Sequence, residues 1–166
     1  MNVWITNIST SKFAGINTLW AAMMREDFIP DKVHLIHLNS GKVDKKSQKE
    51  AYTGYLNLLK RYGGQGTIVI HDYDETNFKN IAREMEALVR EEKSDGHTVA
   101  IDMTPGRKFM SAFSMYMGVG LGLKHKADMI YYLHVKSLGK FNGLPFPMIP
   151  SNLMTLYDLK KEVAGQ

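Results

Sequence analysis

Short apolar, β-branched runs alternate with segments of helical hydrophobic period along almost the whole chain, and this alternation constrains the fold most strongly. Five such runs are predicted to be strands, at residues 3–8, 33–38, 67–70, 98–101 and 128–135. Parallel strands need a crossover, usually a helix, so strands that alternate with helices favour a parallel sheet covered on both faces. Right-handed crossovers then predict one α/β domain over residues 1–166, with a doubly wound, mainly parallel Rossmann-like sheet.

The segments between the strands carry apolar side chains at helical spacing. The first helix is expected to be capped by Asn17 or Thr18, and the second to run from about Asp44, after Asn39-Ser40-Gly41, to Tyr62. Their expected apolar stripes are Leu19, Trp20, Met23 and Met24 in the first, and Tyr52, Leu56 and Leu59 in the second. The third has Phe78, Ile81, Ala82, Met85, Leu88 and Val89. The proline-rich residues 141–150 are expected to be irregular and residues 153–164 to form a short helix.

Composition excludes several classes of function. The chain contains no cysteine, which rules out disulfides, thiolate catalysis and cysteine-ligated zinc or iron–sulfur sites. No apolar run is long enough to span a bilayer, and the start lacks the basic residues of a signal peptide, so we expect a cytoplasmic protein. The net charge of +4 is compatible with a phosphate-bearing ligand, although many basic proteins bind none.

The stretch from His97 to Met110 carries the densest functional pattern. Asp102 and Thr104 stand at the end of a predicted strand, Pro105-Gly106 breaks it, and Arg107-Lys108 opens a helical pattern. A helix N-terminus offers free N–H groups and the positive end of the dipole, so with two cations this turn makes an anion site. The alternative is an ordinary strand-to-helix turn with solvated cations.

A second polar loop follows the first predicted strand. It runs from Ser9 to Gly15 and includes the hydroxyl side chains of Ser9, Thr10 and Ser11. In open α/β sheets a ligand binds beyond the carboxyl ends of the strands, where the winding reverses. If the first strand is central, this loop and the Thr104–Lys108 turn flank the same crevice.

The loops do not match the common nucleotide motifs. The first strand–helix turn offers only Gly15, without G-x-G-x-x-G, and Asn39-Ser40 follows the second strand where a dinucleotide site has an acid. A Walker A motif is also missing. Gly118, Gly120 and Gly122 lie late in a helical segment, where close packing or fraying is expected. Hydroxyls in one loop and cations in the other favour a phosphodiester ligand.

The pattern Asp102-x-Thr104-x-Gly106-x-Lys108 after a buried strand resembles the signature of the CRISPR-associated Rossmann fold (CARF) domains. The loop at Ser9-Thr10-Ser11 is similar to the other ligand loop of that family. The resemblance implies a homodimer that binds cyclic oligoadenylate across its two-fold axis, with no cofactor, no metal ion, and neither membrane nor duplex nucleic acid as a partner. A free-standing domain of this size resembles the ring nucleases, which degrade the messenger and switch off type III CRISPR signalling.

The resemblance also implies roles for individual residues. Ring opening in that family is metal-independent, because a ribose 2′-OH attacks its neighbouring phosphate. Lys108 is then expected to stabilise the developing charge and Ser11 to orient the ribose or phosphate. Neither loop contains a histidine, so we expect a slow enzyme. The expected ligand-binding residues are Ser9, Thr10, Ser11, Lys12, Thr104, Pro105, Gly106, Arg107 and Lys108.

Other readings stay open. The protein is either a ring nuclease, a non-cleaving sensor of the same ligand, or an unrelated Rossmann-like nucleotide-binding protein. His71-Asp72 is the best alternative acid/base pair, and Asp74 is expected to cap a helix. His34 and His37 are predicted on opposite faces of a strand, while His97, His125 and His134 look isolated. Met110 and Phe113 are candidates for the dimer interface, with core packing as the alternative.

Overall fold

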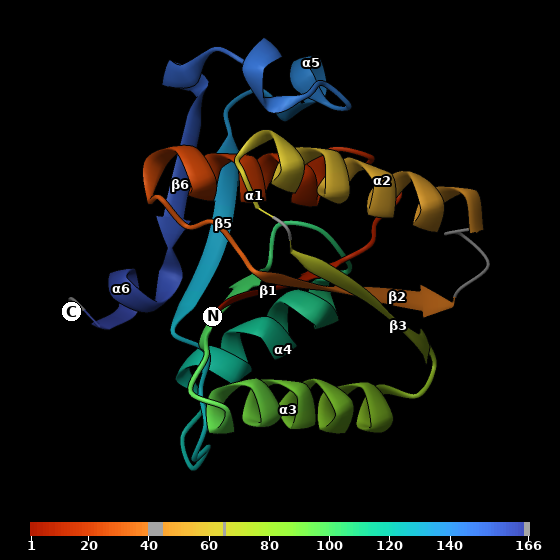
Figure 1. Ribbon diagram of the computed structural model, residues 1–166, viewed down its shortest axis with the longest axis vertical. Helices are drawn as coiled ribbons and strands as arrows, with labels where there is room; N and C mark the ends of the chain where they lie inside the picture. Colours follow the sequence, from red (N-terminus) through yellow and green to blue (C-terminus); the bar gives the residue numbers. More distant parts are fainter. Residues whose placement is uncertain (40–44, 65, 165–166) are drawn as a thin grey trace.

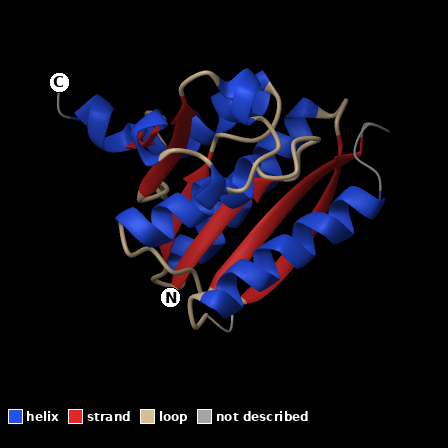
Figure 2. Ribbon diagram, turned by 90° about the horizontal axis from the view of Figure 1, so that it is seen from above, coloured by secondary structure: helices blue, strands red, loops and turns tan. Residues whose placement is uncertain are grey.

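The chain forms one six-stranded sheet with helices on both faces (Figures 1 and 2). This computed structural model describes residues 1–39, 45–64 and 66–164. The strands are β1 (Asn2–Asn7), β2 (Lys32–Asn39), β3 (Thr67–Asp74), β4 (Thr98–Asp102), β5 (Met129–Val135) and β6 (Met154–Asp158). Their order is β3-β2-β1-β4-β5-β6, and all but β6 run parallel. The predicted doubly wound, Rossmann-like α/β fold is therefore confirmed.

Two pairs of long helices cover the sheet (Figure 1). Helices α1 (Ala14–Arg25) and α2 (Lys45–Arg61) lie on one face, while α3 (Phe78–Ser94) and α4 (Lys108–Val119) lie on the other. The C-terminal part adds α5 (Leu138–Phe141), two short 3-10 helices (Phe146–Met148 and Ser151–Leu153) and α6 (Leu159–Ala164). No helix in the described ranges is both long and apolar enough to cross a bilayer.

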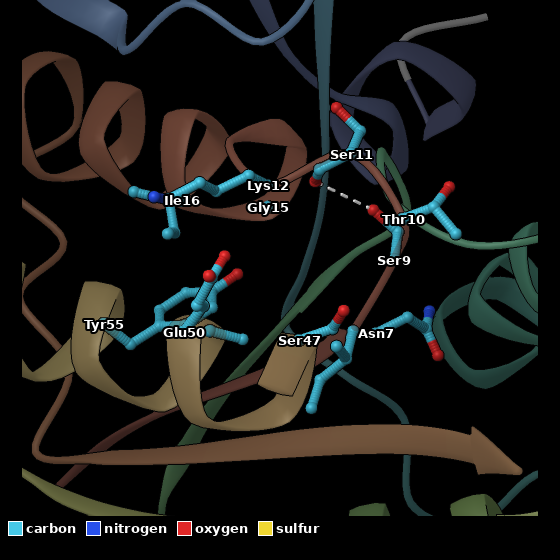
Figure 3. A pocket seen from close by; sticks show the side chains of 12 residues that line it. Asn7, Ser9, Thr10, Ser11, Lys12, Gly15, Ile16, Ser47, Glu50 and Tyr55 are labelled. Carbon is cyan, nitrogen blue, oxygen red and sulfur yellow. Dashed lines mark hydrogen bonds between the residues drawn. The ribbon is translucent and has the colours of Figure 1, made fainter. Parts of the chain in front are cut away.

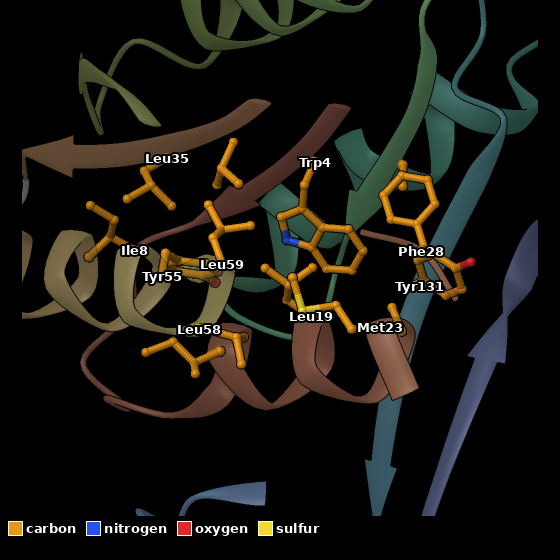
Figure 4. Close-up of a cluster of buried hydrophobic side chains, with 14 residues drawn as sticks. Trp4, Ile8, Leu19, Met23, Phe28, Leu35, Tyr55, Leu58, Leu59 and Tyr131 are labelled. Atoms are coloured by element: carbon orange, nitrogen blue, oxygen red, sulfur yellow. The ribbon is translucent and has the colours of Figure 1, made fainter. Parts of the chain in front are cut away.

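A hydrophobic core lies on each face of the sheet. Beneath α1 and α2, Trp4 stacks on Tyr131 with 5.6 Å between ring centroids, and Leu19 and Leu59 are fully buried beside them (Figure 4). On the opposite face, alternate residues of the same strands pack against α3 and α4, because successive side chains of a strand point to opposite sides. Each central strand is thus apolar on both faces, as a sheet covered on both sides requires.

The C-terminal segment differs from the prediction. Residues 153–164 were expected to form a helix, but Met154–Asp158 is a strand and only Leu159–Ala164 is helical. The strand pairs antiparallel with β5, Tyr132 opposite Tyr157. An unpaired edge of β5 offers hydrogen bonds to this segment, and its alternating apolar residues suit a strand with one covered face.

The helix boundaries and faces also differ in detail. α1 begins at Ala14, so neither Asn17 nor Thr18 caps it; both side chains are buried within the helix. On α2 the buried residues are Tyr55, Leu58 and Leu59, whereas the predicted Tyr52 is 38% exposed. Asp74 accepts hydrogen bonds from Thr76 in the turn before α3, and Asn77 is the cap of that helix. The expected helix start at Asp44 and the residues Ser40-Gly41 lie outside the described residues.

Candidate functional site

The winding of the sheet reverses between β1 and β4. These strands are neighbours, with Trp4 opposite Ala100, and the chain proceeds from β1 toward β2 and β3 but from β4 toward β5. Strand β1 is therefore central, as the sequence argument required, and the loops after β1 and β4 lie side by side at the carboxyl edge. Asn7 Nδ2 donates to the carbonyl of Pro105 over 3.5 Å and joins the two loops directly.

The loop after β1 is held by its own hydroxyl groups. Ser9 Oγ donates to the carbonyl of Ser11 over 3.1 Å (dashed in Figure 3), and Ser11 Oγ donates to Asn142 Oδ1 over 3.4 Å. Thr10 is exposed at the tip of the loop. The serine that the sequence singled out is thus connected to the segment after β5, which lies 131 residues further along the chain.

On the α2 side of this loop lies a small hollow of about 50 Å³ (Figure 3). Glu50 and Ser47 of α2 line it together with Lys12. A carboxylate opposes the binding of a phosphate at close range, and the volume is that of a few water molecules. A phosphodiester ligand therefore fits better on the other side of the loop.

The conformation of the turn after β4 depends on a glycine at 106 and a hydroxyl at 104. Gly106 has φ 106°, a conformation that side chains rarely adopt, and a Cβ there would lie 3.2 Å from Asn7 Nδ2. Thr104 Oγ1 accepts a hydrogen bond of 2.9 Å from the N–H of Leu133 and so ties the turn to β5. Arg107 is the cap of α4 and makes no side-chain capping hydrogen bond. The N-terminus of α4 therefore keeps N–H groups that can face a ligand.

Asp102 anchors this turn from below. Its side chain is fully buried and accepts hydrogen bonds from the N–H of Thr104 (2.8 Å) and from Thr6 Oγ1 (3.1 Å). Burial raises the pKa of Asp102 to about 7, although hydrogen bonds from these groups oppose the shift. Asp102 has no access to a ligand, so its place in the motif is to fix the turn.

A cavity of about 450 Å³ opens between the two loops and the end of β5. Of the predicted ligand-binding residues, six line it: Ser9, Thr10, Ser11, Thr104, Pro105 and Gly106. Lys12, Arg107 and Lys108 do not line it. The remaining wall includes polar and aromatic side chains that the sequence argument did not single out: Tyr132, His134, Phe141 and Asn142.

The three predicted cations lie around the cavity in different settings. Arg107 pairs with the buried carboxylate of Glu75, which follows β3. Lys12 Nζ lies 5.6 Å from the ring centroid of Phe13. Lys108 is exposed in the first turn of α4, and no ion pair is found for it among the described residues. Lys108 is therefore the most available of the three for an anionic ligand.

The two side chains of the alternative acid/base pair, His71 and Asp72, lie on opposite faces of the sheet. His71 Nε2 lies 2.8 Å from His34 Nδ1 on the α3 side of the sheet. Asp72 Oδ1 lies 2.5 Å from His37 Nδ1 on the α2 side, where Gln48 also reaches it. The two residues thus point to opposite faces of β3, and the prediction that His34 and His37 face opposite ways is confirmed. In the described ranges, no group of three or more His, Asp or Glu side chains is placed to hold a metal ion.

Two other expectations are wrong. Met110 is fully buried in the core beneath α4, so it cannot form a dimer interface, whereas Phe113 is only partly buried. His97 is not isolated, because its Nδ1 lies 2.7 Å from Glu92 Oε2. The expectation for the late glycines holds at Gly118, where a Cβ would lie 2.1 Å from Ile130.

These features define a Rossmann-like protein with a cavity at its switch point, and comparison with known proteins assigns it to a family. The family model for CRISPR-associated protein NE0113 matches residues 21–145, more than half of the chain. The chain therefore belongs to this CRISPR-associated family. No curated protein matches the sequence closely enough to count as a relative.

Among solved structures, the fold is similar to that of Csm6 from Enterococcus italicus, which was determined bound to cyclic hexa-2′-fluoro-hexa-dAMP. The TM-score is 0.57 and the sequence identity 14%, over 82% of this chain and 34% of that one. This chain thus spans about a third of the length of that Csm6. At this identity the likeness is one of fold alone, in agreement with the predicted Rossmann-like fold.

Proposed function

We propose that this protein binds a cyclic oligoadenylate at the switch-point cavity and opens the ring by metal-independent phosphodiester cleavage, which would end type III CRISPR signalling. The observation that carries the proposal is the meeting of the hydroxyl loop and the Thr104–Gly106 turn in one cavity beside the uncapped N-terminus of α4. Membership of a CRISPR-associated family, and the cyclic hexanucleotide on the Csm6 neighbour, support this class of ligand.

The proposed chemistry needs little from the protein, because the substrate supplies its own nucleophile. A ribose 2′-OH attacks the adjacent phosphorus, the P–O5′ bond breaks, and the products are a 2′,3′-cyclic phosphate and a 5′-hydroxyl. The protein aligns the attack and stabilises the charge on the phosphorane. We assign the first task to Ser11 and the second to Lys108 with the N–H groups of the α4 N-terminus.

A complete site requires a second copy of the chain. A cavity of about 450 Å³ is the size of a pocket for one small ligand, and a ring of four or six nucleotides exceeds it. Because such a ring has rotational symmetry, an isologous dimer would present each loop twice around it. We therefore propose a homodimer with its axis near the N-terminus of α4.

A non-cleaving sensor is the second candidate. One observation favours it: the guanidinium of Arg107 is engaged by Glu75, and Lys108 lies outside the cavity lining. A sensor would need only the hydroxyl and backbone contacts that the cavity already provides.

Substitution of Lys108 separates the two candidates. If Lys108 stabilises charge that develops only in the transition state, Lys108→Ala slows ring opening about 100-fold and weakens binding much less. Single-turnover cleavage of cyclic tetra-adenylate, with binding measured by calorimetry, gives both quantities. Lys124→Ala, an exposed lysine in the loop after α4, is the matched control and keeps the wild-type rate. Cleavage by Lys108→Ala at the wild-type rate under saturating ring would remove Lys108 from the mechanism.

A further inference from the structure

Strand β5, the neighbour of β4, contributes a histidine to the cavity, and neither of the two loops contains one. β5 runs parallel to β4, with Asp102 opposite Tyr131, so its carboxyl end opens at the same edge of the sheet as the loop after β4. His134 is the last residue but one of this strand and lines the cavity together with Ser11 and Thr104. A histidine is thus present beside the hydroxyl loop, although it is distant from it in sequence.

The environment of His134 differs from that of the other histidines. Hydrogen bonds engage the rings of His34, His37, His71 and His97 with neighbouring side chains. For His134 the described residues provide no such bond, and its ring lies 6.3 Å from that of Tyr132 between centroids. His125 also has no side-chain partner there, but it lies in the loop after α4 and does not line the cavity. Among the histidines, His134 is thus the one that lines the cavity and makes no side-chain hydrogen bond to a described residue.

The backbone beside His134 is fixed to the turn after β4. The backbone N–H of Leu133 donates to Thr104 Oγ1 over 2.9 Å, so the end of β5 is fixed to the turn after β4. On its other side His134 is opposite Thr155 of β6. Among the described residues, no Asp, Glu, Lys or Arg lines the cavity, and Tyr132 is the other titratable side chain there. His134 is therefore the imidazole available for proton transfer in this cavity.

We propose that His134 is the general base of ring opening, an assignment that rests on the proposed ring-nuclease function. The neutral imidazole takes the proton of the attacking 2′-OH while the 2′-oxygen forms its bond to phosphorus. The electron pair of the breaking P–O5′ bond goes to O5′, which takes a proton from water, and the imidazolium returns its proton to solvent. No water is consumed, so the products are the 2′,3′-cyclic phosphate and the 5′-hydroxyl.

The test is the pH–rate profile of His134→Gln, since glutamine keeps hydrogen-bonding capacity but cannot accept this proton. Cleavage of cyclic tetra-adenylate by the whole chain is measured at saturating ring and in EDTA, between about pH 5 and 9. We expect a rate loss on the order of 100-fold in the variant, with binding changed only a few-fold. The wild-type rate rises with pH to a plateau as the base loses its proton, and the variant loses this inflection.

His125→Gln is the matched control and keeps both the rate and the profile. An inflection that persists in His134→Gln, or an equal loss in both variants, overturns the assignment while wild-type cleavage leaves the proposed function standing. If the wild type itself fails to cleave either a tetra-adenylate or a hexa-adenylate ring, the ring-nuclease function fails, and the assignment of a base fails with it.

Discussion

Asp102 and Gly106 shape the turn after β4 from opposite sides. The buried carboxylate accepts the N–H of Thr104, and the glycine allows a positive φ next to Asn7. Both residues belong to the motif found in the sequence, yet both act by packing and need not contact a ligand. Their packing positions Thr104 and the N-terminus of α4, which can contact one.

At this scale the sequence predicted one part of the cavity lining but not another. Ser9, Ser11, Thr104 and Gly106 were predictable because each follows directly on a strand that ends at the switch point. His134 obeys the same rule, since it lies near the carboxyl end of a correctly predicted strand. The contact between Ser11 and Asn142 depends on the path of an irregular segment, which no local pattern reports.

The raised pKa of Asp102 predicts how stability depends on pH. The folded state holds the proton up to about pH 7, whereas in the unfolded chain the carboxyl ionises near its usual value of 3.8. The contribution of Asp102 to the free energy of unfolding therefore falls as the pH rises between these values. Asp102→Asn, a neutral isostere, should remove this fall and be more stable than the wild type at pH 8 by about 4 kcal/mol, because the pKa rises from 3.8 to about 7.

Urea unfolding followed by circular dichroism at pH 5 and pH 8 measures this difference. The exposed Asp95→Asn, in the turn after α3, is the control and should show the wild-type dependence. A wild-type advantage over Asp102→Asn that grows toward pH 8 would mean that the buried carboxylate is ionised.

Among the elements, the C-terminal segment shows that the local sequence pattern does not always determine secondary structure. Met154 and Leu156 pack against the sheet because β5 presents an open edge, and that edge exists only once the sheet has formed. The prediction of a helix at residues 153–164 rests on local pattern, which does not report this edge. The five parallel strands and the four long helices are each supported by their own periodicity, and those were predicted.

Asn17 gives a second example at the scale of elements. Its amide donates to the carbonyl of Leu144 over 2.9 Å and accepts from the N–H of Phe146 over 2.7 Å. This residue in α1 thus holds the segment that follows the cavity wall at Phe141 and Asn142. The local pattern predicts a cap at this polar residue, but its partners lie 127 and 129 residues away.

Helix α3 is fastened to the sheet by a buried polar network around Glu92. Its carboxylate accepts from Lys32 Nζ (2.8 Å), His34 Nε2 (2.9 Å) and His97 Nδ1 (2.7 Å). Burial opposes ionisation, but the hydrogen bonds from Lys32, His97 and His34 outweigh it and lower the pKa of Glu92 to about 2. Burial also lowers the pKa of His34 and of His71.

This network predicts destabilisation by acid. The stability from the neutral histidines is present above their unfolded pKa of 6.5 and is lost as the pH falls below it, and that from Glu92 is lost below 4.5. Glu92→Gln leaves buried donors without their carboxylate and should lower the free energy of unfolding by about 3 kcal/mol at pH 7. On acidification to pH 4, the variant should lose less stability than the wild type.

Urea titrations at the two pH values, with the exposed Glu91→Gln on the same helix as the control, check this prediction. Equal stabilities of Glu92→Gln and the wild type at pH 7 would show that the network does not hold α3 in place.

For the whole molecule, the proposed ligand predicts the oligomeric state. A ring that exceeds one cavity needs two, so we expect a dimer at micromolar concentration or on addition of ring. The interface is expected beside the cavity, near the partly buried Phe113 and away from the buried Met110. Light scattering with and without cyclic tetra-adenylate measures the mass, and a monomer under both conditions would be incompatible with a shared site.

The most direct test of the central claim is incubation of the wild-type protein with cyclic tetra-adenylate or cyclic hexa-adenylate in the presence of EDTA, followed by chromatography. We predict that one of the two rings is lost and that linear products with a 2′,3′-cyclic phosphate and a 5′-hydroxyl replace it. Binding with both rings intact after prolonged incubation would identify a sensor, and the absence of both binding and cleavage would contradict the account altogether.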